Sequence, residues 1–278
     1  MSMAVSDRLL QIISHSGLSR LVGRSADLKL PRPLLRVLLQ TYVTALGIDL
    51  EETARPLSSF ESFDDFFTRA LRPGARPIAP GERVATSPVD SRVMNTGVAH
   101  DGQLFQVKGS RYSAADLLGD AAEARKFNGG SYITLYLSPA DYHRIHAPLD
   151  GEIHGFRYVP GRLYPVNELG MKRVPRLFTH NERLTTYLKT ALGLVAVVKV
   201  GATSVGRITV SYTDTTTNQP GGEPHALFYA RPKRIAKGDE LGRFHLGSTV
   251  VLLFEPPALA FGSHVRPDRL LRVGQRLT

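Results

Sequence analysis

The stretch Lys237–Pro257, KGDELGRFHLGSTVVLLFEPP, is the most informative part of the chain. The run from Thr249 to Phe254 is apolar and rich in β-branched residues, which predicts a buried strand that begins at Ser248. Gly247 precedes this serine and has no side chain to cover its own carbonyl group. A serine hydroxyl held against that carbonyl could attack it, although Gly-Ser-Thr before a strand is also an ordinary turn.

The composition is that of a folded protein without cysteine chemistry. The 278 residues are 42% hydrophobic and 22% charged, which supports one large domain or one domain with a smaller appendage. Cysteine is absent, which excludes disulfides, thiol nucleophiles and cysteine-ligated metals. A reducing compartment is compatible with this absence.

The chain is basic, with 35 Lys and Arg residues against 25 Asp and Glu residues and a formal net charge of +10. Its partners are therefore expected to be anionic, and both nucleic acid and acidic lipid qualify. No zinc-finger spacing, RNA-binding aromatic motif or long basic tract occurs, so nucleic acid is not expected. A basic surface without a specialised partner is the plain alternative.

Residues 1–72 are predicted to be a helical segment. Apolar residues recur at near-helical spacing over residues 9–22 and predict a first helix. A second helix is expected between Pro33 and Gly47, with one apolar side. That side comprises Leu35, Leu38, Leu39, Tyr42, Val43 and Leu46. A third, shorter helix is expected to begin near Ser62 and to include Phe66, Phe67 and Leu71.

The first two predicted helices carry six basic residues against two acidic ones up to Gly47, a balance of +4. This pattern is typical of a helix pair on an anionic membrane surface, where each nearby basic residue contributes about 1 kcal/mol. A helical layer packed on the protein's own core is the alternative. The hydrophobic run over residues 34–48 includes Arg36 and falls short of the roughly 20 residues of a bilayer span, so no membrane crossing is expected. The first residues of the chain do not have the pattern of a secretory signal, so none is expected.

Residues 73–278 are predicted to form one compact, mainly antiparallel β-rich domain. Prolines and glycines separate short strand-like runs in this part of the chain. The runs are Leu104–Val107, Tyr132–Leu137, Leu194–Val200, Ile208–Tyr212 and Val250–Phe254. Together with the helical segment, they predict the α+β class.

Two further places contain polar groups in unusual company. Asp90 follows a Ser-Pro-Val turn sequence, where an isolated Asp most often bonds its own backbone. His143 and His146 lie three residues apart directly after a predicted strand and could share a helical or turn face. Two such histidines also suggest a metal, but no third ligand pattern accompanies them, so no metal is expected.

The Asp, His and Ser places resemble, in order and in context, those of the phosphatidylserine decarboxylase family. The most specific matching elements are DYHRIHAP (141–148) and KGDELGRFHLGST (237–249). Other matching segments are SFESFDDFFTRALRPGARPI (59–78), QVKGSRYSAADLLG (106–119), GRLYPVN (161–167), LFTHNER (177–183) and VGATSVGRI (200–208). Two residues depart from the family's pattern, Ser91 where glycine is usual and Pro165 where serine is common. Neither departure removes a chemical group, but Ser91 could alter the turn beside Asp90.

The resemblance implies self-cleavage between Gly247 and Ser248. By family match, Asp90 orients His146, His146 activates Ser248, and Ser248 Oγ attacks the Gly247 carbonyl. Elimination of the resulting ester leaves dehydroalanine, which hydrolyses to a pyruvoyl group and ammonia. The products would be a β chain, residues 1–247, and an α chain, residues 248–278.

The implied cofactor is this covalent pyruvoyl group, derived from Ser248. It would form a Schiff base with the amine of phosphatidylserine and accept electrons as CO₂ leaves, giving phosphatidylethanolamine. A proton must then be delivered to carbon, and His143 is the candidate donor. A bond from His143 to a backbone carbonyl, holding its turn, is the structural alternative.

The implied location is peripheral, on the cytoplasmic face of the bacterial inner membrane. The implied partners are phosphatidylserine, the anionic membrane surface and the protein's own two chains. A homodimer is also compatible with the sequence, which specifies neither oligomeric state nor acyl-chain preference.

Other functions fit the same residues. Asp90, His146 and Ser248 could form a serine hydrolase acting in trans, although Ser248 lies in no G-x-S-x-G elbow and no oxyanion loop is evident. A basic membrane- or RNA-binding module, with Gly247-Ser248 as a mere turn, is a second alternative. A related enzyme acting on another serine-bearing lipid is a third.

Overall fold

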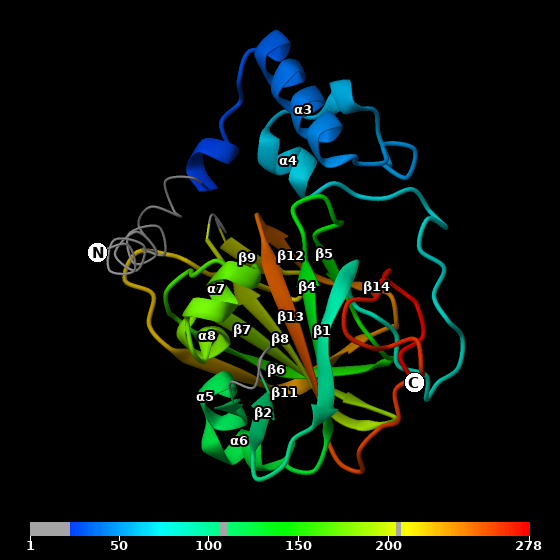
Figure 1. The fold of residues 1–278 in the computed structure, drawn as a ribbon, viewed down its shortest axis with the longest axis vertical. Coiled ribbons are helices and arrows are strands. Elements are labelled where there is room, and N and C mark those ends of the chain that lie inside the picture. Colours follow the sequence, from blue (N-terminus) through cyan, green and yellow to red (C-terminus); the bar gives the residue numbers. More distant parts are fainter. Residues whose placement is uncertain (1–22, 106–110, 204–206) are drawn as a thin grey trace.

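The computed structural model describes residues 23–105, 111–203 and 207–278, so the helix predicted over residues 9–22 lies outside the described residues. Residues 23–72 form a helical cap at one end of a β-rich body (Figure 1). The longest helix of the cap is α3 (Arg32–Leu46), which ends at Gly47 in the left-handed conformation.

Two short helices complete the cap, η1 (Leu57–Ser59) and α4 (Phe63–Phe67). The side chain of Ser62 caps α4 by accepting a hydrogen bond from the backbone N–H of Asp65, at 3.1 Å. The prediction that Leu71 belongs to this helix was wrong, because α4 ends at Phe67 and Leu71 instead forms an isolated β-bridge with Thr53.

The body contains two antiparallel sheets, which confirms the predicted α+β class. The larger sheet has the order β11-β6-β7-β8-β13-β4-β1-β14, and the smaller has the order β10-β9-β12-β5. The strands of the larger sheet are β1 (Ser91–Val98), β4 (Ser131–Leu137), β6 (Gly151–Val159), β7 (Arg183–Thr190), β8 (Gly193–Gly201), β11 (His225–Ile235), β13 (Ser248–Phe254) and β14 (Leu270–Leu271). Those of the smaller sheet are β5 (Arg144–His146), β9 (Arg207–Val210), β10 (Thr213–Thr216) and β12 (Glu240–His245).

A second group of elements covers the outer face of the larger sheet. It consists of the hairpin β2 (Gln103–Phe105) and β3 (Arg111–Ser113) and the helices α5 (Ala114–Leu118), α6 (Ala121–Arg125), α7 (Glu168–Arg173) and α8 (Leu177–His180). The strands predicted at β4, β8 and β13 are confirmed. The one predicted to reach Tyr212 ends at Val210, and residues 106 and 107 of the first predicted run lie outside the described residues.

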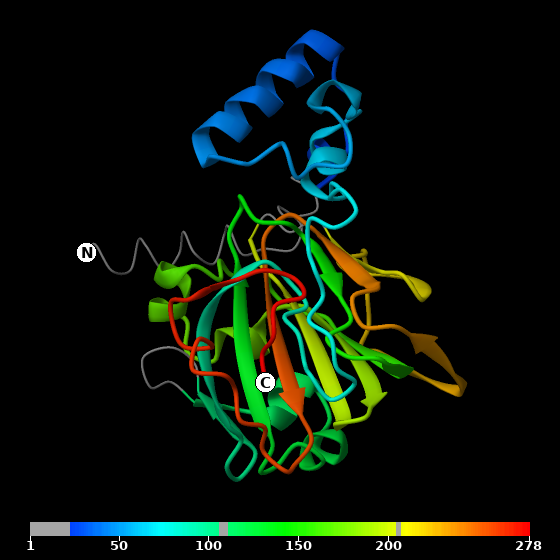
Figure 2. The ribbon, with the colours of Figure 1, turned by 90° about the vertical axis from the view of Figure 1, so that its right-hand side faces the viewer.

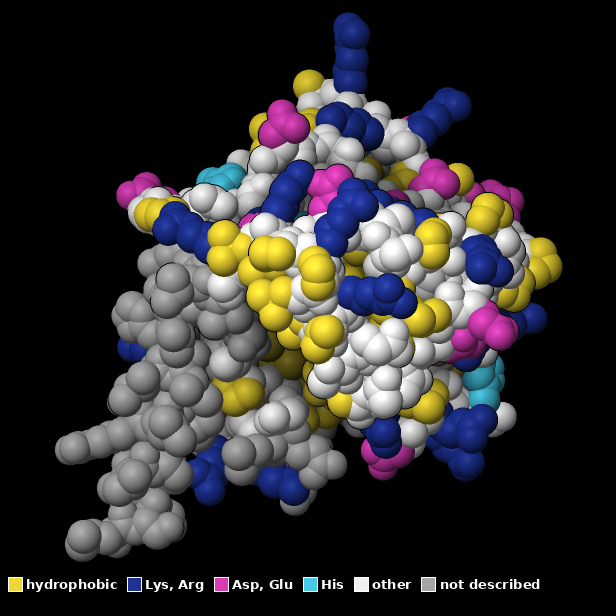
Figure 3. All heavy atoms as spheres, turned by 90° about the horizontal axis from the view of Figure 1, so that it is seen from above, with side chains coloured by type: hydrophobic (Ala, Val, Ile, Leu, Met, Phe, Trp, Pro, Cys, Tyr) yellow, Lys and Arg dark blue, Asp and Glu magenta, His cyan; other side chains and the backbone are white. Residues whose placement is uncertain are grey.

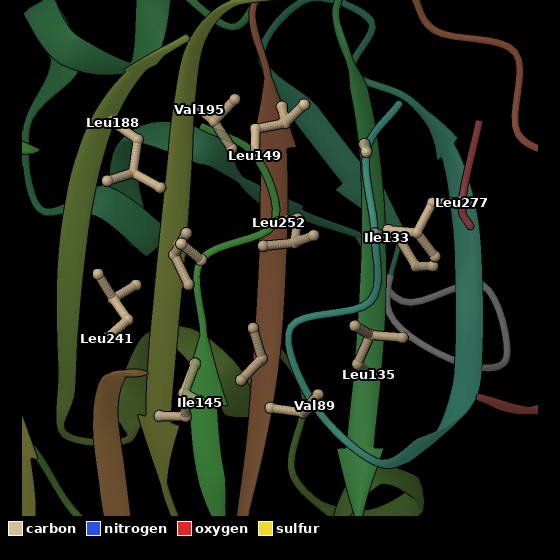
Figure 4. Close-up of a cluster of buried hydrophobic side chains, with 14 of the residues drawn as sticks. Val89, Ile133, Leu135, Ile145, Leu149, Leu188, Val195, Leu241, Leu252 and Leu277 are labelled. Carbon is tan, nitrogen blue, oxygen red and sulfur yellow. The ribbon is translucent and has the colours of Figure 1, made fainter. Parts of the chain in front are cut away.

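Strand β13 is buried along its whole length. Val250, Leu252 and Phe254 face the core between the two sheets, shown in part in Figure 4. Val251 and Leu253 face a second core, beneath the outer helices. Fully burying an aliphatic or aromatic side chain of this size is worth about 1.5–3 kcal/mol, so β13 contributes heavily to stability. A strand covered on both faces needs no polar alternation, which explains its continuous apolar sequence.

The buried side of α3 is narrower than predicted. Three residues, Leu35, Leu39 and Val43, pack in a small core of the cap together with Phe60 and Phe66. Two further residues of the predicted apolar side, Leu38 and Leu46, are exposed. The described partners of α3 are short elements, which cover only one stripe of the helix.

A buried lysine lies in the core between the sheets. Lys199 on β8 is fully buried and its Nζ donates hydrogen bonds to Thr186 Oγ1 at 2.6 Å and to the Val197 carbonyl at 3.2 Å. Thr186 Oγ1 also lies 2.5 Å from the hydroxyl of Tyr212. Burial lowers the pKa of Lys199 well below its ordinary value, because no buried carboxylate offsets the desolvation of the ammonium.

We therefore predict that Lys199 makes stability depend on pH between 7 and 9. The unfolded lysine binds a proton that the folded one releases, so the free energy of unfolding should rise with pH. The expected slope is about 1.4 kcal/mol per pH unit, and Lys199→Met should remove it. The measurement is urea unfolding at several pH values, with Ser248→Ala in both chains to keep them intact. Parallel stability curves for the two chains would contradict the prediction.

Candidate functional site

Ser248 begins β13 directly after a tight turn. The turn residues Leu246 and Gly247 have φ angles of +83° and +35°, both in the left-handed region. Such a conformation costs a non-glycine residue about 1–2 kcal/mol, so the turn stores strain at Leu246. A side chain at Gly247 would find open space, with its nearest neighbour 3.9 Å away, so the backbone conformation and not crowding favours glycine there.

The hydroxyl of Ser248 is buried and has no hydrogen-bond partner among the residues that the structure describes. A buried polar group left without a partner costs about 1–3 kcal/mol, which a purely structural residue would not retain without reason. The serine is also held firmly, because its backbone pairs with Leu137 on β4 and with Gly201 on β8. Ser248 therefore presents a desolvated hydroxyl directly after a turn whose residues are in the left-handed conformation.

His143 presents a free nitrogen in the same region. Its backbone carbonyl accepts a hydrogen bond from Phe244 N at 3.0 Å, which places it beside the strand that leads into the β12–β13 turn. Its Nδ1 lies 2.8 Å from the Asp141 carbonyl, which can only accept, so Nδ1 carries the hydrogen. Nε2 is buried without a partner, and burial lowers the pKa of His143 to about 3. The ring is thus neutral, with an open lone pair on Nε2.

His146 has both ring nitrogens engaged. Nδ1 lies 2.6 Å from the Gly238 carbonyl and therefore carries the hydrogen, while Nε2 accepts from the Tyr142 hydroxyl at 3.1 Å. Burial lowers the pKa of His146, and the bond to Gly238 partly opposes this effect. The prediction that the two histidines share a helical or turn face was wrong, because His146 lies in strand β5 and His143 precedes that strand.

Asp90 is held by other partners than the histidine predicted for it. Arg76 binds its carboxylate through Nε at 3.0 and 3.1 Å and through Nη2 at 2.6 Å, and the backbone N–H of Val273 donates at 2.8 Å. The segments of Asp90 and His146 are nevertheless adjacent, since His146 N donates to the Pro88 carbonyl at 2.8 Å. The charge of Asp90 also raises the pKa of His146, as the last of several effects.

Among the described residues, no hydrogen bond joins Asp90, His143, His146 and Ser248 to one another, although backbone bonds link His146 to Pro88 and His143 to Phe244. Asp90 acts on His146 through space, and the Ser248 hydroxyl contacts neither histidine by a hydrogen bond. Ser91, which departs from the family's pattern, begins β1 in extended conformation, so no glycine is required beside Asp90.

Three neighbours of the site were not predicted. Tyr142 bonds His146, Arg76 binds Asp90, and the ring of Phe67 lies 4.0 Å from that of His143. The available signal was that these residues lie within the segments 59–78 and 141–148, which both match the family's pattern.

A cavity of about 240 Å³ lies between the cap and the body, beside Asp90. Two of its arginines, Arg76 and Arg272, pair with carboxylates. Arg69 is buried and bonds only the Ala140 carbonyl at 3.2 Å, while its Nε and Nη1 have no hydrogen-bond partner. The wall of the cavity therefore includes a guanidinium group without a carboxylate partner.

The described part of the chain contains neither a metal-ligating cluster nor a membrane-spanning helix. No three side chains of the metal-ligating types converge there on a common point. No helix among the described residues is both long and apolar enough to span a membrane.

Comparisons with known proteins agree on one family. The sequence model of the phosphatidylserine decarboxylase family matches residues 63–278. A protein of Anaeromyxobacter sp. (strain K) is 48% identical over 279 residues, covering 98% of this chain and 99% of its own. One of Myxococcus xanthus is 44% identical over 272 residues, covering 97% and 96%, and one of Brevibacillus brevis is 43% identical over 272 residues, covering 97% and 95%. All three are named phosphatidylserine decarboxylase proenzyme.

Proposed function

The chain belongs to the phosphatidylserine decarboxylase family, and we propose that it generates its catalytic group by cutting its own Gly247–Ser248 bond. It is a carboxy-lyase that converts phosphatidylserine to phosphatidylethanolamine and CO₂, and it is made as a proenzyme. A serine hydrolase acting in trans and a non-enzymatic binding module are thereby set aside. The observation that carries the proposal is the buried, unpartnered Ser248 hydroxyl beside a left-handed turn.

The cleavage needs only groups of this chain and one water. Ser248 Oγ attacks the Gly247 carbonyl carbon, an ester C–O bond replaces the peptide C–N bond, and the hydroxyl proton passes to the released amine. We assign the proton transfer to His146, because its Nδ1 carries the hydrogen and its Nε2 can accept one after exchanging Tyr142 for the serine. Loss of the serine α-proton then expels the Gly247 carboxylate, and water converts the remaining dehydroalanine to pyruvoyl and ammonia.

The surroundings of Ser248 suit a pyruvoyl group, because the position is buried and its backbone is paired on both sides. The pyruvoyl ketone supplies an electron sink for the departure of CO₂. His143 Nε2 can take the proton that the substrate ammonium gives up and return it to carbon. Burial lowers the pKa of His143 to about 3, so the ring is neutral in the uncut chain, and this proton transfer requires that bound substrate raise that pKa. Burial keeps competing water away from both transfers.

The cavity beside Asp90 suits the head group of phosphatidylserine. Phosphate and carboxylate groups are preferred partners of a guanidinium, and Arg69 has donors without an acceptor. The loop of Asp141 and Tyr142 lines this cavity and leads directly into His143. A head group bound there would lie at the entrance to the proposed reaction site.

The cap has the composition of a membrane-binding face. Leu34, Val37, Leu38 and Leu46 of α3 are 38–63% exposed, and the neighbouring Arg32 and Arg36 are exposed as well. Figure 3 looks down on the end of the molecule that carries the cap and shows hydrophobic side chains interspersed with Lys and Arg. Apolar side chains bordered by cations are typical of a helix lying in an anionic lipid surface. We propose peripheral attachment through this face, on the cytoplasmic side of the cell membrane.

The first prediction concerns the cut itself. Purified protein should consist of two chains that separate only on denaturation, with the small one comprising residues 248–278. Intact mass spectrometry should find this chain one ammonia lighter than the same chain with an unmodified serine, and it should react with borohydride. Ser248→Ala should remain a single chain. Recovery of the parent as one full-length, unmodified chain would refute the proposal.

The second prediction separates the two histidines. His146→Ala and Asp90→Asn should accumulate uncut precursor, because losses for members of such a triad reach several orders of magnitude. His143→Ala should still be cut but should release CO₂ from phosphatidylserine about 10²–10⁴-fold more slowly, the usual contribution of a general acid. The exposed His100 offers a matched control, since His100→Ala should affect neither step.

The free Nε2 of His143 in the uncut chain favours one alternative assignment. If His143→Ala blocks cleavage while His146→Ala is cut normally, the two roles are exchanged. If neither substitution changes either step, both histidines are structural.

The third prediction tests the membrane face. Replacing Leu34, Val37 and Leu38 by Ser should reduce co-sedimentation with phosphatidylserine-containing vesicles, since exposed apolar contacts are removed while the buried stripe of α3 is kept. High salt should weaken binding of the parent without abolishing it. Leu227→Ser/Phe228→Ser is the control, because these exposed apolar residues lie on β11, away from the cap. Equal binding of both variants and the parent would show that α3 does not contact lipid.

A further inference from the structure

Helix α4 contacts His143 and also His245, the last residue of β12 before the β12–β13 turn. Asp64 and Phe67 lie three positions apart, so they project from the same side of this short helix. Phe67 packs against the ring of His143 with centroids 4.0 Å apart. Asp64 reaches His245, the residue just before the turn. One helix of the cap therefore contacts His143 and the residue that precedes the Leu246–Gly247 turn, His245.

The bond between Asp64 and His245 is direct and buried. His245 Nδ1 lies 2.8 and 3.0 Å from the two carboxylate oxygens of Asp64, and the two residues are only 9% and 7% exposed. Arg207 approaches the same carboxylate at 3.4 Å and is itself bound by Asp27 at 2.7 and 3.1 Å. A buried hydrogen bond to a carboxylate is costly to break by removing one partner, because the group that remains is left unsatisfied.

His245 is not placed to act as the base. A carboxylate can only accept, so Nδ1 carries the hydrogen, and Nε2 lies 3.0 Å from the hydroxyl of Thr209 on β9. Both nitrogens are thus engaged with groups other than Ser248, whose hydroxyl has no partner. The pair resembles the Asp–His part of a triad, but its contacts point to a role in holding the backbone.

The turn needs such an anchor. Leu246 and Gly247 are both left-handed, and strained conformations persist only where the surrounding structure determines them on each side. On the downstream side, Ser248 is fixed by its pairing with Leu137 and Gly201. On the upstream side, the backbone of His245 pairs with Arg207 on β9, and its side chain bonds Asp64 and Thr209.

We propose that Asp64 is a positioning residue for self-cleavage. Its bond to His245 holds the Leu246–Gly247 turn in its left-handed conformation and keeps the Gly247 carbonyl against the Ser248 hydroxyl. Because Asp64 belongs to the cap, the precursor is cut only once the cap has docked on the body (Figure 2). This inference rests on the proposed cleavage between Gly247 and Ser248, and adds to it a requirement for assembly of the cap.

The test follows cleavage of freshly translated chains on a gel over time. Asp64→Ala and His245→Ala should each slow cleavage about 10–100-fold, the loss typical of a misplaced reacting group. Asp64→Asn and His245→Asn should recover part of the rate, because an amide still offers an acceptor to the imidazole or a donor to the carboxylate. The Asp64→Ala/His245→Ala double variant should be no slower than the slower single variant, as for two members of one interaction.

Asp65→Ala is the matched control, since Asp65 lies on the same helix but bonds Arg55 and the backbone N–H of Glu61. It should be cut at the parent's rate. Hydroxylamine should not cut the slowed Asp64→Ala chain, because the ester has not formed. Urea unfolding in the Ser248→Ala background should show that each variant is folded at the temperature of the assay.

The outcomes separate this inference from the proposed function. If the parent chain is not cut between Gly247 and Ser248, the proposed function itself fails. If the parent is cut and Asp64→Ala is cut equally fast, the positioning role is wrong. It is also wrong if Asp65→Ala is slowed as much as Asp64→Ala, or if the effects of the two alanine substitutions multiply in the double variant.

Discussion

The burial of strand β13 on both faces is the constraint on which the rest of the site depends. Its side chains belong to two cores at once, so the strand cannot shift in register without exposing apolar surface on one side or the other. Ser248 is the first residue of this strand and inherits its fixed position. The Ser248 hydroxyl is therefore positioned by hydrophobic packing, and the polar groups around it are not needed to hold the strand in place.

The polar groups show what such an arrangement costs. His143 Nε2, the Ser248 hydroxyl and the Thr249 hydroxyl are all buried without partners, and Leu246 is held in a left-handed conformation. Each of these features opposes folding by an amount of the order of 1 kcal/mol or more. The extensive apolar core of the body offsets these costs, so the left-handed turn and the unpaired polar groups can persist in the folded precursor.

The sequence was informative where a local pattern determines the structure. The uninterrupted apolar run of β13 could only be a buried element, and the sequence alone located it together with Gly247 and Ser248. Strand β1 escaped prediction because Asn95, Thr96 and Gly97 interrupt its pattern, although its backbone still pairs with β4.

Contacts between distant segments could not be read from the sequence. Helical periodicity predicted the apolar side of α3 but not how much of it the neighbouring elements would cover, and Leu38 on that side is exposed. The partner of Asp90 was predicted as His146, yet Arg76 and Val273 N occupy its carboxylate. The hydrogen bond between Asp64 and His245 joins residues 181 positions apart, and the sequence around neither residue predicts it.

The position of β13 in the middle of the sheet has a consequence for the lifetime of the enzyme. A break before Ser248 leaves the last 31 residues, 248–278, attached by strand pairing to β4 and β8. Backbone bonds between residues 274–277 and residues 85–87, and the bond from Val273 N to the Asp90 carboxylate, hold the fragment as well. The fragment supplies a central strand, so it cannot leave without dismantling both cores. Once the two pieces are separated, however, refolding becomes a second-order encounter between an incomplete sheet and a short apolar peptide. The precursor can fold as a single molecule, whereas the mature form, once denatured, has lost the tether that guided its assembly.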